Sequence, residues 1–128
     1  MKSILIDTDI LIDFANNDII AQERLVQESQ KLLLTISIIT KLELMVGCRN
    51  KRELESLEKF LKQFIILQLN QQISIRAEQL INYYYLSHGL LIPDALIAAT
   101  AIEYKIPLLS KNQRDYRFIS ELNLWKYP

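Results

Sequence analysis

Short apolar runs alternate along this chain with longer segments in which apolar residues recur at helical spacing. Runs of the first kind are typical of strands buried in a parallel sheet, and spacing of the second kind predicts helices. The pattern predicts strands at 3–7, 32–36, 65–67 and 107–109, with a weaker fifth strand near 122–125. The predicted helices run from 8 to a break at 16–18, from there to about 30, and over 38–46, 50–64, 70–88 and 93–104.

Residues at the ends of these helices support the same division of the chain. Thr8 and Asp9 offer an N-cap for the first helix, and Ser37 offers one for the helix after the second strand. Gly47 and Gly89 end two of the helices, as glycine commonly does. Strands that alternate with helices favour a three-layer α/β/α sandwich around a central parallel sheet of four to five strands.

Composition narrows the class of protein without indicating a function. The 128 residues predict a single domain over 1–128. The formal net charge is zero, which argues against binding nucleic acid by charge alone but leaves metal-assisted chemistry on nucleic acid open. Cys48 is the lone cysteine, so no internal disulfide can form, and a reducing cytoplasm is expected. Acids interrupt the N-terminal apolar run too early for a signal peptide, and no run reaches the ~18 apolar residues of a membrane span.

Four acidic residues that are far apart in sequence are predicted to meet at one edge of the sheet. Asp7 ends the first strand, and Glu43 lies in the helix that leaves the second strand. Asp94 lies in the first turn of the helix that runs back into the fourth strand, and Asp115 follows that strand by a few residues. All four positions therefore belong to the carboxyl edge, where parallel α/β sheets bind their ligands.

Two of these acids have unusually apolar neighbours. Asp94 is the only acid in the first two turns of PDALIAATAI, which is apolar nearly all round. Glu43 lies at the rim of the predicted buried stripe of its helix. That stripe comprises Ile39, Leu42, Met45 and Val46.

Each acid taken singly has a local explanation as a partner of a helix dipole, a turn cap or a solvated charge. Together the four acids need a compensating positive charge, because two unit charges ~4 Å apart repel by about 4 kcal/mol at an effective dielectric constant near 20. A cluster of four carboxylates therefore indicates a bound cation. Oxygen ligands without histidine or cysteine favour Mg²⁺ or Mn²⁺.

The blocks ILIDTDILID, ITKLELMVG, PDALIAATA and LLSKNQRDY occur in an order and spacing that resemble the PIN domain. The specific resemblance is to VapC-type ribonuclease toxins of bacterial toxin–antitoxin pairs, and it covers essentially the whole chain. By motif, the acidic quartet of the family corresponds to Asp7, Glu43, Asp94 and Asp115. Family members typically carry threonine where this chain has Ser110, and often asparagine where it has Asp9.

The resemblance implies divalent-metal-dependent cleavage of RNA phosphodiester bonds, with the four acids as catalytic residues and as ligands of Mg²⁺ or Mn²⁺. Either Glu43 or Asp94 would orient or deprotonate the attacking water, a choice that the sequence leaves open. The accessory polar residues expected at the site are Thr8, Asp9, Ser110 and Asn112. The role of Asp9 stays open between a helix cap, an orienting group and an extra ligand.

The resemblance also implies two protein partners. One is a second copy of the chain in a homodimer, and the other is a small antitoxin that inhibits by covering the acidic site. Composition and periodicity indicate neither of them.

Two other function classes compete with the ribonuclease. The DTD block after the first strand also resembles the nucleophile motif of haloacid dehalogenase-type phosphohydrolases, but an apolar pair follows it where that family has small polar residues. A binding or scaffold module could keep the fold without chemistry. A receiver-like module would need an aspartate after the third strand, where this chain has Gln68.

Other polar residues are given no catalytic role. His88 precedes Gly89 at a helix end, where the helix dipole favours it. Two basic clusters are interpreted as solvated surface. They comprise Arg49, Lys51 and Arg52, and further along the chain Lys105, Lys111, Arg114 and Arg117.

Overall fold

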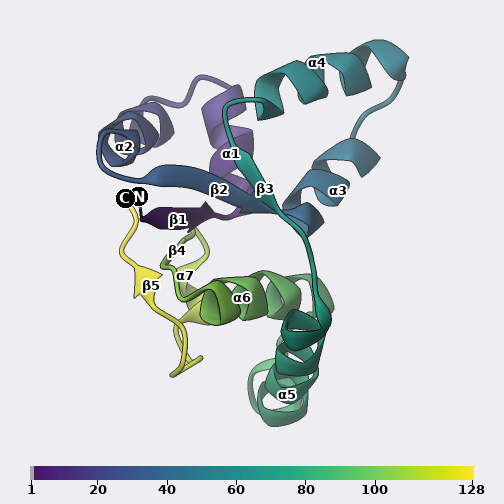
Figure 1. The fold of residues 1–128 in the computed structure, drawn as a ribbon, viewed down its shortest axis with the longest axis vertical. Coiled ribbons are helices and arrows are strands. Elements are labelled where there is room, and N and C mark those ends of the chain that lie inside the picture. Colours follow the sequence, from purple (N-terminus) through teal and green to yellow (C-terminus); the bar gives the residue numbers. More distant parts are fainter. Residues whose placement is uncertain (1) are drawn as a thin grey trace.

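The computed structural model describes residues 2–128. Its strands are β1 (Ser3–Ile6), β2 (Leu33–Ser37), β3 (Ile65–Leu67), β4 (Leu108–Leu109) and β5 (Leu124–Trp125). They form one sheet in the order β3-β2-β1-β4-β5, and every neighbouring pair is parallel. The predicted parallel sheet is confirmed, with the weak fifth strand included (Figure 1).

Helices connect the strands, and all but one match the prediction closely. They are α1 (Thr8–Ala15), α2 (Ile19–Ser29), α3 (Ile38–Val46), α4 (Lys51–Leu61), α5 (Gln71–His88), α6 (Ile92–Tyr104) and α7 (Gln113–Tyr116). The helix α7 was not predicted, because four residues are too few to display a helical period. None of the helices within residues 2–128 is both long and apolar enough to cross a bilayer.

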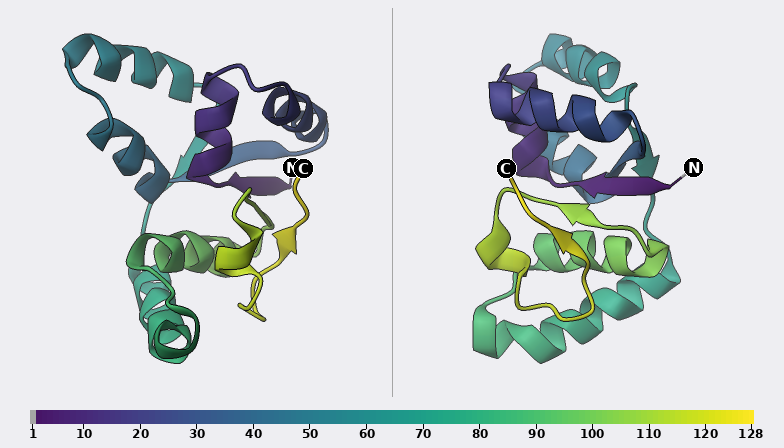
Figure 2. Two further views of the ribbon diagram at one scale, coloured as in Figure 1. Left: turned by 180° about the vertical axis from the view of Figure 1, so that it is seen from behind. Right: turned by 90° about the vertical axis from the view of Figure 1, so that its left-hand side faces the viewer.

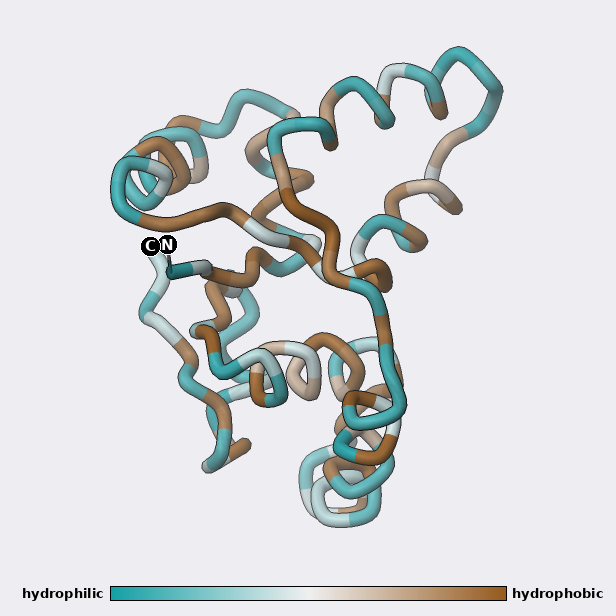
Figure 3. Tube along the Cα trace, in the orientation of Figure 1, coloured by the Kyte–Doolittle hydropathy of each residue, from teal (hydrophilic) through white to brown (hydrophobic). Residues whose placement is uncertain are grey.

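The sheet separates two apolar cores, so the predicted three layers are confirmed. Successive side chains of a strand point to opposite faces. Leu5 of β1 packs with α5 and α6 in one core, whereas Ile4 and Ile6 pack with α1, α2 and α4 in the other. Figure 2 shows the two helical layers on either side of the sheet, and Figure 3 shows the apolar positions gathered along the strands between them.

The helix caps agree with the prediction at Ser37, Gly47 and Gly89 and differ at the start of α1. Ser37 caps α3, because its hydroxyl accepts a hydrogen bond from the backbone N–H of Ile39. Gly89 ends α5 with a φ of 69°, a left-handed conformation that glycine adopts without strain. The expected cap of α1 at Thr8 or Asp9 is wrong, since the capping residue is Asp7. Its side chain accepts from the N–H of Thr8, which is the first residue of the helix.

The predicted buried stripe of α3 is also wrong. Leu42 is 47% exposed and Val46 is 85% exposed. Ile39 packs against one core and Leu44 against the other. The helix therefore lies across the edge of the sheet and not on one face, so its contacts divide between the layers and its outer side stays open.

The strand order reverses direction beside β1. The chain passes from β1 to β2 and β3 on one side, and then returns to place β4 and β5 on the other. The carboxyl ends of β1 and β4 thus flank the switch point of the sheet, the position at which open α/β sheets bind ligands.

Candidate active site

Asp7 lies at this switch point. Ile6 pairs with Leu109 in the sheet, so Asp7 and Ser110 follow adjoining strands. The Ser110 hydroxyl donates to Oδ2 of Asp7 over 2.6 Å, and the backbone N–H of Thr8 donates to Oδ1 over 2.9 Å. The side chain is only 4% exposed. One buried carboxylate is therefore held in a fixed orientation by the ends of two strands.

The ionisation of Asp7 is strongly perturbed. Its pKa is raised from 3.8 to about 7, chiefly because burial disfavours the charged carboxylate and next because of the negative charge of Asp9. The hydrogen bonds from Ser110 and Thr8 oppose this rise. A buried carboxyl with such a shift in a site of converging acids is typical of functional positions.

Tyr116, at the end of α7, lies between two of the predicted site acids. Its hydroxyl is 3.2 Å from Oδ1 of Asp94 and 3.4 Å from Oδ1 of Asp7. A tyrosine hydroxyl carries a single proton, so the two carboxylates share one donor. Burial, followed by the negative charges of Asp7 and Asp94, raises the pKa of Tyr116, which keeps the phenol neutral and able to donate.

Asp94 lies in the first turn of α6, as predicted. Burial is the largest cause of its raised pKa, and the negative charges of Asp115, Glu43 and Asp9 raise it further. The hydrogen bond from Tyr116 acts in the opposite direction. Asp94 is therefore within electrostatic reach of acids from three other parts of the chain.

Glu43 reaches the same region from α3. Its Oε1 accepts a hydrogen bond of 2.8 Å from the hydroxyl of Thr8. That hydroxyl is also 2.9 Å from the hydroxyl of Thr40, the buried residue of α3. Glu43 itself is exposed, so Thr8 ties a solvent-facing carboxylate to the end of β1.

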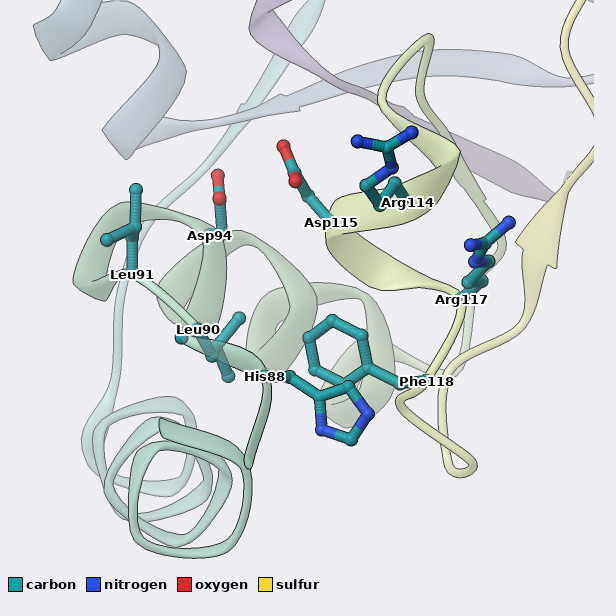
Figure 4. Close-up of a pocket in the computed structure, with 9 residues that line it drawn as sticks. His88, Leu90, Leu91, Asp94, Arg114, Asp115, Arg117 and Phe118 are labelled. Carbon is teal, nitrogen blue, oxygen red and sulfur yellow. The ribbon is translucent and has the colours of Figure 1, made fainter. Parts of the chain in front are cut away.

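Asp115 lies on the unpredicted helix α7. Figure 4 shows its carboxylate and that of Asp94 side by side, on the same side of the chain. Both line a hollow of about 410 Å³ that continues towards the end of α5. The other three acids of the predicted quartet thus lie within electrostatic reach of Asp94 on α6, from the end of β1 and from α3 and α7.

Asp9 is the fifth acid of this region. Its Oδ1 accepts from the backbone N–H of Ile10 over 2.8 Å, and more weakly from that of Lys111 over 3.5 Å. Its Oδ2 is buried and has no hydrogen-bond partner among the described residues. Burial raises the pKa of Asp9 as well. Asp13, further along the same helix, accepts from the ammonium group of Lys111 over 2.8 Å.

Ser110 and Asn112 differ in how closely they approach the site. Ser110 is fully buried and contacts Asp7 directly. Asn112 is exposed and acts through its backbone N–H, which donates to the Ser110 hydroxyl over 3.0 Å. The two residues therefore form a relay to Asp7 in which the amide side chain of Asn112 takes no part.

The carboxylates suit a hard divalent cation in kind but do not form a closed cage. Among residues 2–128, no three acidic, histidine or cysteine side chains stand close enough together to chelate one ion. Mg²⁺ is usually held by one or two carboxylates together with water and substrate phosphate, and needs no such cage. The orphaned oxygen of Asp9 and the raised pKa values of Asp7 and Asp94 indicate negative charge that the protein leaves uncompensated.

Three residues of this region were not predicted from the sequence. Tyr116 gives no sequence signal, because an aromatic residue next to an acid is indistinguishable from an ordinary core residue. His88 and Phe118 line the hollow beside Asp94, with their rings stacked 4.2 Å apart between centroids. His88 was interpreted only as a helix-end residue, and its position next to Gly89, which turns the chain towards α6, is the signal that could have placed it here.

Comparison with known proteins supports one family over nearly the whole chain. The model of the PIN domain matches residues 4–120. Ribonuclease VapC1 of Methanocaldococcus jannaschii is 33% identical over 98% of this chain and 88% of its own length. Ribonuclease VapC10 of Mycobacterium tuberculosis is 29% identical over 98% of this chain and 86% of its own.

Solved structures agree with this match. A chain of a toxin–antitoxin complex from Klebsiella pneumoniae is 31% identical and superimposes with a TM-score of 0.80 over 97% of both chains. A DNA-bound VapBC from Salmonella typhimurium, 21% identical with a TM-score of 0.83 over 98% of both chains, supports the fold alone. The chain therefore belongs to the PIN domain family, as the matched family model, the similar relatives and the shared architecture show.

Proposed function

We propose that this protein is a metal-dependent endoribonuclease and the toxin of a type II toxin–antitoxin pair. The observation that carries the proposal is the gathering of Asp7, Glu43, Asp94 and Asp115 at the switch point of a PIN-family sheet. The ribonuclease names of the relatives support RNA as the substrate. The toxin–antitoxin complex among the similar structures supports the pairing.

The four acids are the proposed ligands of one or two Mg²⁺ or Mn²⁺ ions. When bound, such an ion lowers the pKa of a coordinated water and stabilises negative charge on the scissile phosphate. The donor set supports this choice, since hard carboxylate oxygens prefer these cations. Asp9 adds a further buried oxygen at the same place.

The surrounding residues have positioning roles in this proposal. Ser110 fixes Asp7, and Thr8 fixes Glu43, each through one short hydrogen bond. Glu43 and Asp94 are both candidates for orienting the attacking water or taking its proton. Asp115 would hold the exposed side of the site.

The antitoxin is proposed to be a small protein that binds across α3 and covers the acids. Leu42 and Val46 lie one turn apart on the open side of α3, and Glu43 is next to Leu42 in sequence. Exposed apolar side chains grouped in this way mark interaction surfaces. A homodimer and a cytoplasmic site of action belong to the same proposal and are supported by the family alone.

The competing functions are less well supported. A haloacid dehalogenase-type phosphohydrolase would carry small polar residues after the DTD block, whereas this chain has the fully buried apolar pair Ile10 and Leu11 there. A non-catalytic scaffold does not account for five acids around the switch point, of which Asp7, Asp9 and Asp94 have raised pKa values. A scaffold also predicts that divalent cations do not bind.

Incubation of the purified protein with total cellular RNA tests the proposal. We expect discrete cleavage products with Mg²⁺ or Mn²⁺, no cleavage with a chelator, and recovery when the divalent ion is restored. Isothermal calorimetry on the same preparation should show binding of Mn²⁺. Absence of both cleavage and Mn²⁺ binding would favour the scaffold.

A further inference from the structure

The hollow beside the acids extends well beyond them. It lies between the end of α5, the start of α6 and α7, and its volume of about 410 Å³ falls in the range of pockets that hold small ligands, roughly 300–1,000 Å³. Asp94 and Asp115 lie towards one end, and the rings of His88 and Phe118 lie towards the other (Figure 4). A ligand reaching from the acids would therefore meet an aromatic surface.

The rings of this aromatic surface extend from the core to the exterior of the protein. Tyr84 is buried, and its ring lies 5.3 Å from that of half-buried Phe118. His88 is exposed and stacks on Phe118, with 4.2 Å between centroids and 11° between planes. Phe118 covers one face of the imidazole and the Tyr84 ring lies 6.0 Å away, yet His88 remains exposed to solvent.

The stack is also held in place. Nδ1 of His88 lies 2.8 Å from the hydroxyl of Ser87, and the backbone N–H of Ser120 donates to the hydroxyl of Tyr84 over 3.4 Å. These contacts restrain the imidazole of His88 and the ring of Tyr84 in the positions that the structure shows. A rigid aromatic face loses little conformational entropy on binding.

Positive charge lies along the same hollow. Arg114 and Arg117 line it from α7 and the residue after it, and both are exposed. Arginine pairs readily with phosphate groups. The hollow thus combines an acidic end, a basic side and a flat ring.

We propose that this hollow is a nucleobase subsite of the RNA substrate, in which one unstacked base lies against His88 while Arg114 and Arg117 hold the phosphates beside it. The inference rests on the proposed ribonuclease function and names how that site takes single-stranded RNA. Proteins read such RNA by stacking splayed bases on aromatic rings, with positive side chains following the backbone. The cut would fall at the phosphate next to the stacked base.

Kinetics on a short single-stranded RNA test the proposal. This RNA contains the sequence at which the wild-type protein cleaves total cellular RNA. Stacking on one ring is worth enough that His88→Ala should raise KM roughly tenfold, with kcat nearly unchanged. His88→Tyr keeps a ring and loses the imidazole, so it should restore KM, and Tyr104→Ala, which removes an exposed ring at the far end of α6, should leave KM unchanged.

An abasic scan separates stacking from a structural role. For the wild type, removing the base at one position next to the cut should raise KM about as much as His88→Ala does. For the His88→Ala variant, removing the same base should raise KM no further. The inference would be overturned if the wild type and His88→Ala had equal KM. It would also be overturned if each abasic position raised KM equally in both proteins. Either result would leave the proposed ribonuclease function intact. A wild-type protein that cuts no RNA would overturn both.

Discussion

The hydroxyl of Tyr116 donates a hydrogen bond to Oδ1 of Asp94 over 3.2 Å, while the same hydroxyl lies 3.4 Å from Oδ1 of Asp7. One neutral donor therefore joins the acid that ends β1 to the acid that begins α6. Without it, the buried carboxylate of Asp7 and the half-buried carboxylate of Asp94 would lose the donor that they share. This geometry makes Tyr116 a positioning residue for the proposed metal ligands.

Tyr116→Phe should separate this role from the packing of the ring. The ring stays in the core, so the free energy of unfolding should fall by only about 1 kcal/mol. The pKa of Asp94 should rise further, because the hydrogen bond that lowers it is gone. Carboxyl NMR titration of the metal-free protein measures this directly. Tyr104→Phe, at an exposed position, is the matched control, and an unchanged Asp94 pKa in Tyr116→Phe would contradict the role.

The buried Asp7 predicts how the stability of the metal-free protein depends on pH. Its pKa is raised from 3.8 to about 7, so between these values the folded protein keeps a proton that the unfolded chain releases. The free energy of unfolding should therefore fall as pH rises through this window, by up to roughly 4 kcal/mol. Urea unfolding with a chelator present checks this slope, and a stability that rises over the same window would show that Asp7 is not the dominant group.

Asp7→Asn should remove this loss of stability at high pH. An amide stays neutral and can still accept from Thr8, so the variant should be more stable than the wild type at about pH 8 and no more stable at about pH 4. Mn²⁺ should stabilise the wild type and have little effect on the variant, since only a ligand bound to the folded state shifts stability. A variant less stable than the wild type at high pH would argue against an uncompensated charge.

The contact between Thr8 and Glu43 predicts an effect on metal affinity. Thr8→Val keeps the shape of the side chain and removes the hydroxyl that fixes Oε1 of Glu43. Loss of such an orienting group should lower the affinity for Mn²⁺ roughly tenfold, and Thr8→Ser should retain it. Calorimetric titration gives both values. Equal affinities for valine and serine variants would mean that Thr8 does not orient the ligand.

The open side of α3 predicts where the antitoxin binds. Leu42→Gln combined with Val46→Gln should weaken the complex with the antitoxin at least tenfold, because both side chains would lose apolar burial. Ile19→Gln on α2, a position 68% exposed, is the control and should bind normally. The affinity is measured by calorimetry with the purified antitoxin, and an unaffected double variant would place the partner elsewhere.

How far the sequence predicted the site depended on the kind of residue. Asp7, Glu43, Asp94 and Asp115 were accessible because parallel strands bring their carboxyl ends to one edge, wherever the residues lie in the chain. The cap of α1 was misplaced because Asp7 serves two roles, as cap and as site acid, and sequence patterns assign one role to each residue.

Other features could not be predicted for physical reasons. Helical spacing identifies a buried stripe only when a helix packs on one face, and α3 instead divides its contacts between two cores. The helix α7 is shorter than two turns, so Tyr116 had no periodic context. Stacking of His88 on Phe118 joins the end of α5 to the residues after α7, a contact that depends on the completed fold.

RNA cleavage by Asp94→Asn, compared with Asp13→Asn, tests the central claim most directly. Both substitutions remove one negative charge, but Asp94 belongs to the acidic cluster whereas Asp13 pairs with Lys111 outside it. With Mn²⁺ and equal protein, we predict that Asp94→Asn loses cleavage to background while Asp13→Asn stays close to wild type. Full cleavage by folded Asp94→Asn would contradict the claim that these four acids form the active site.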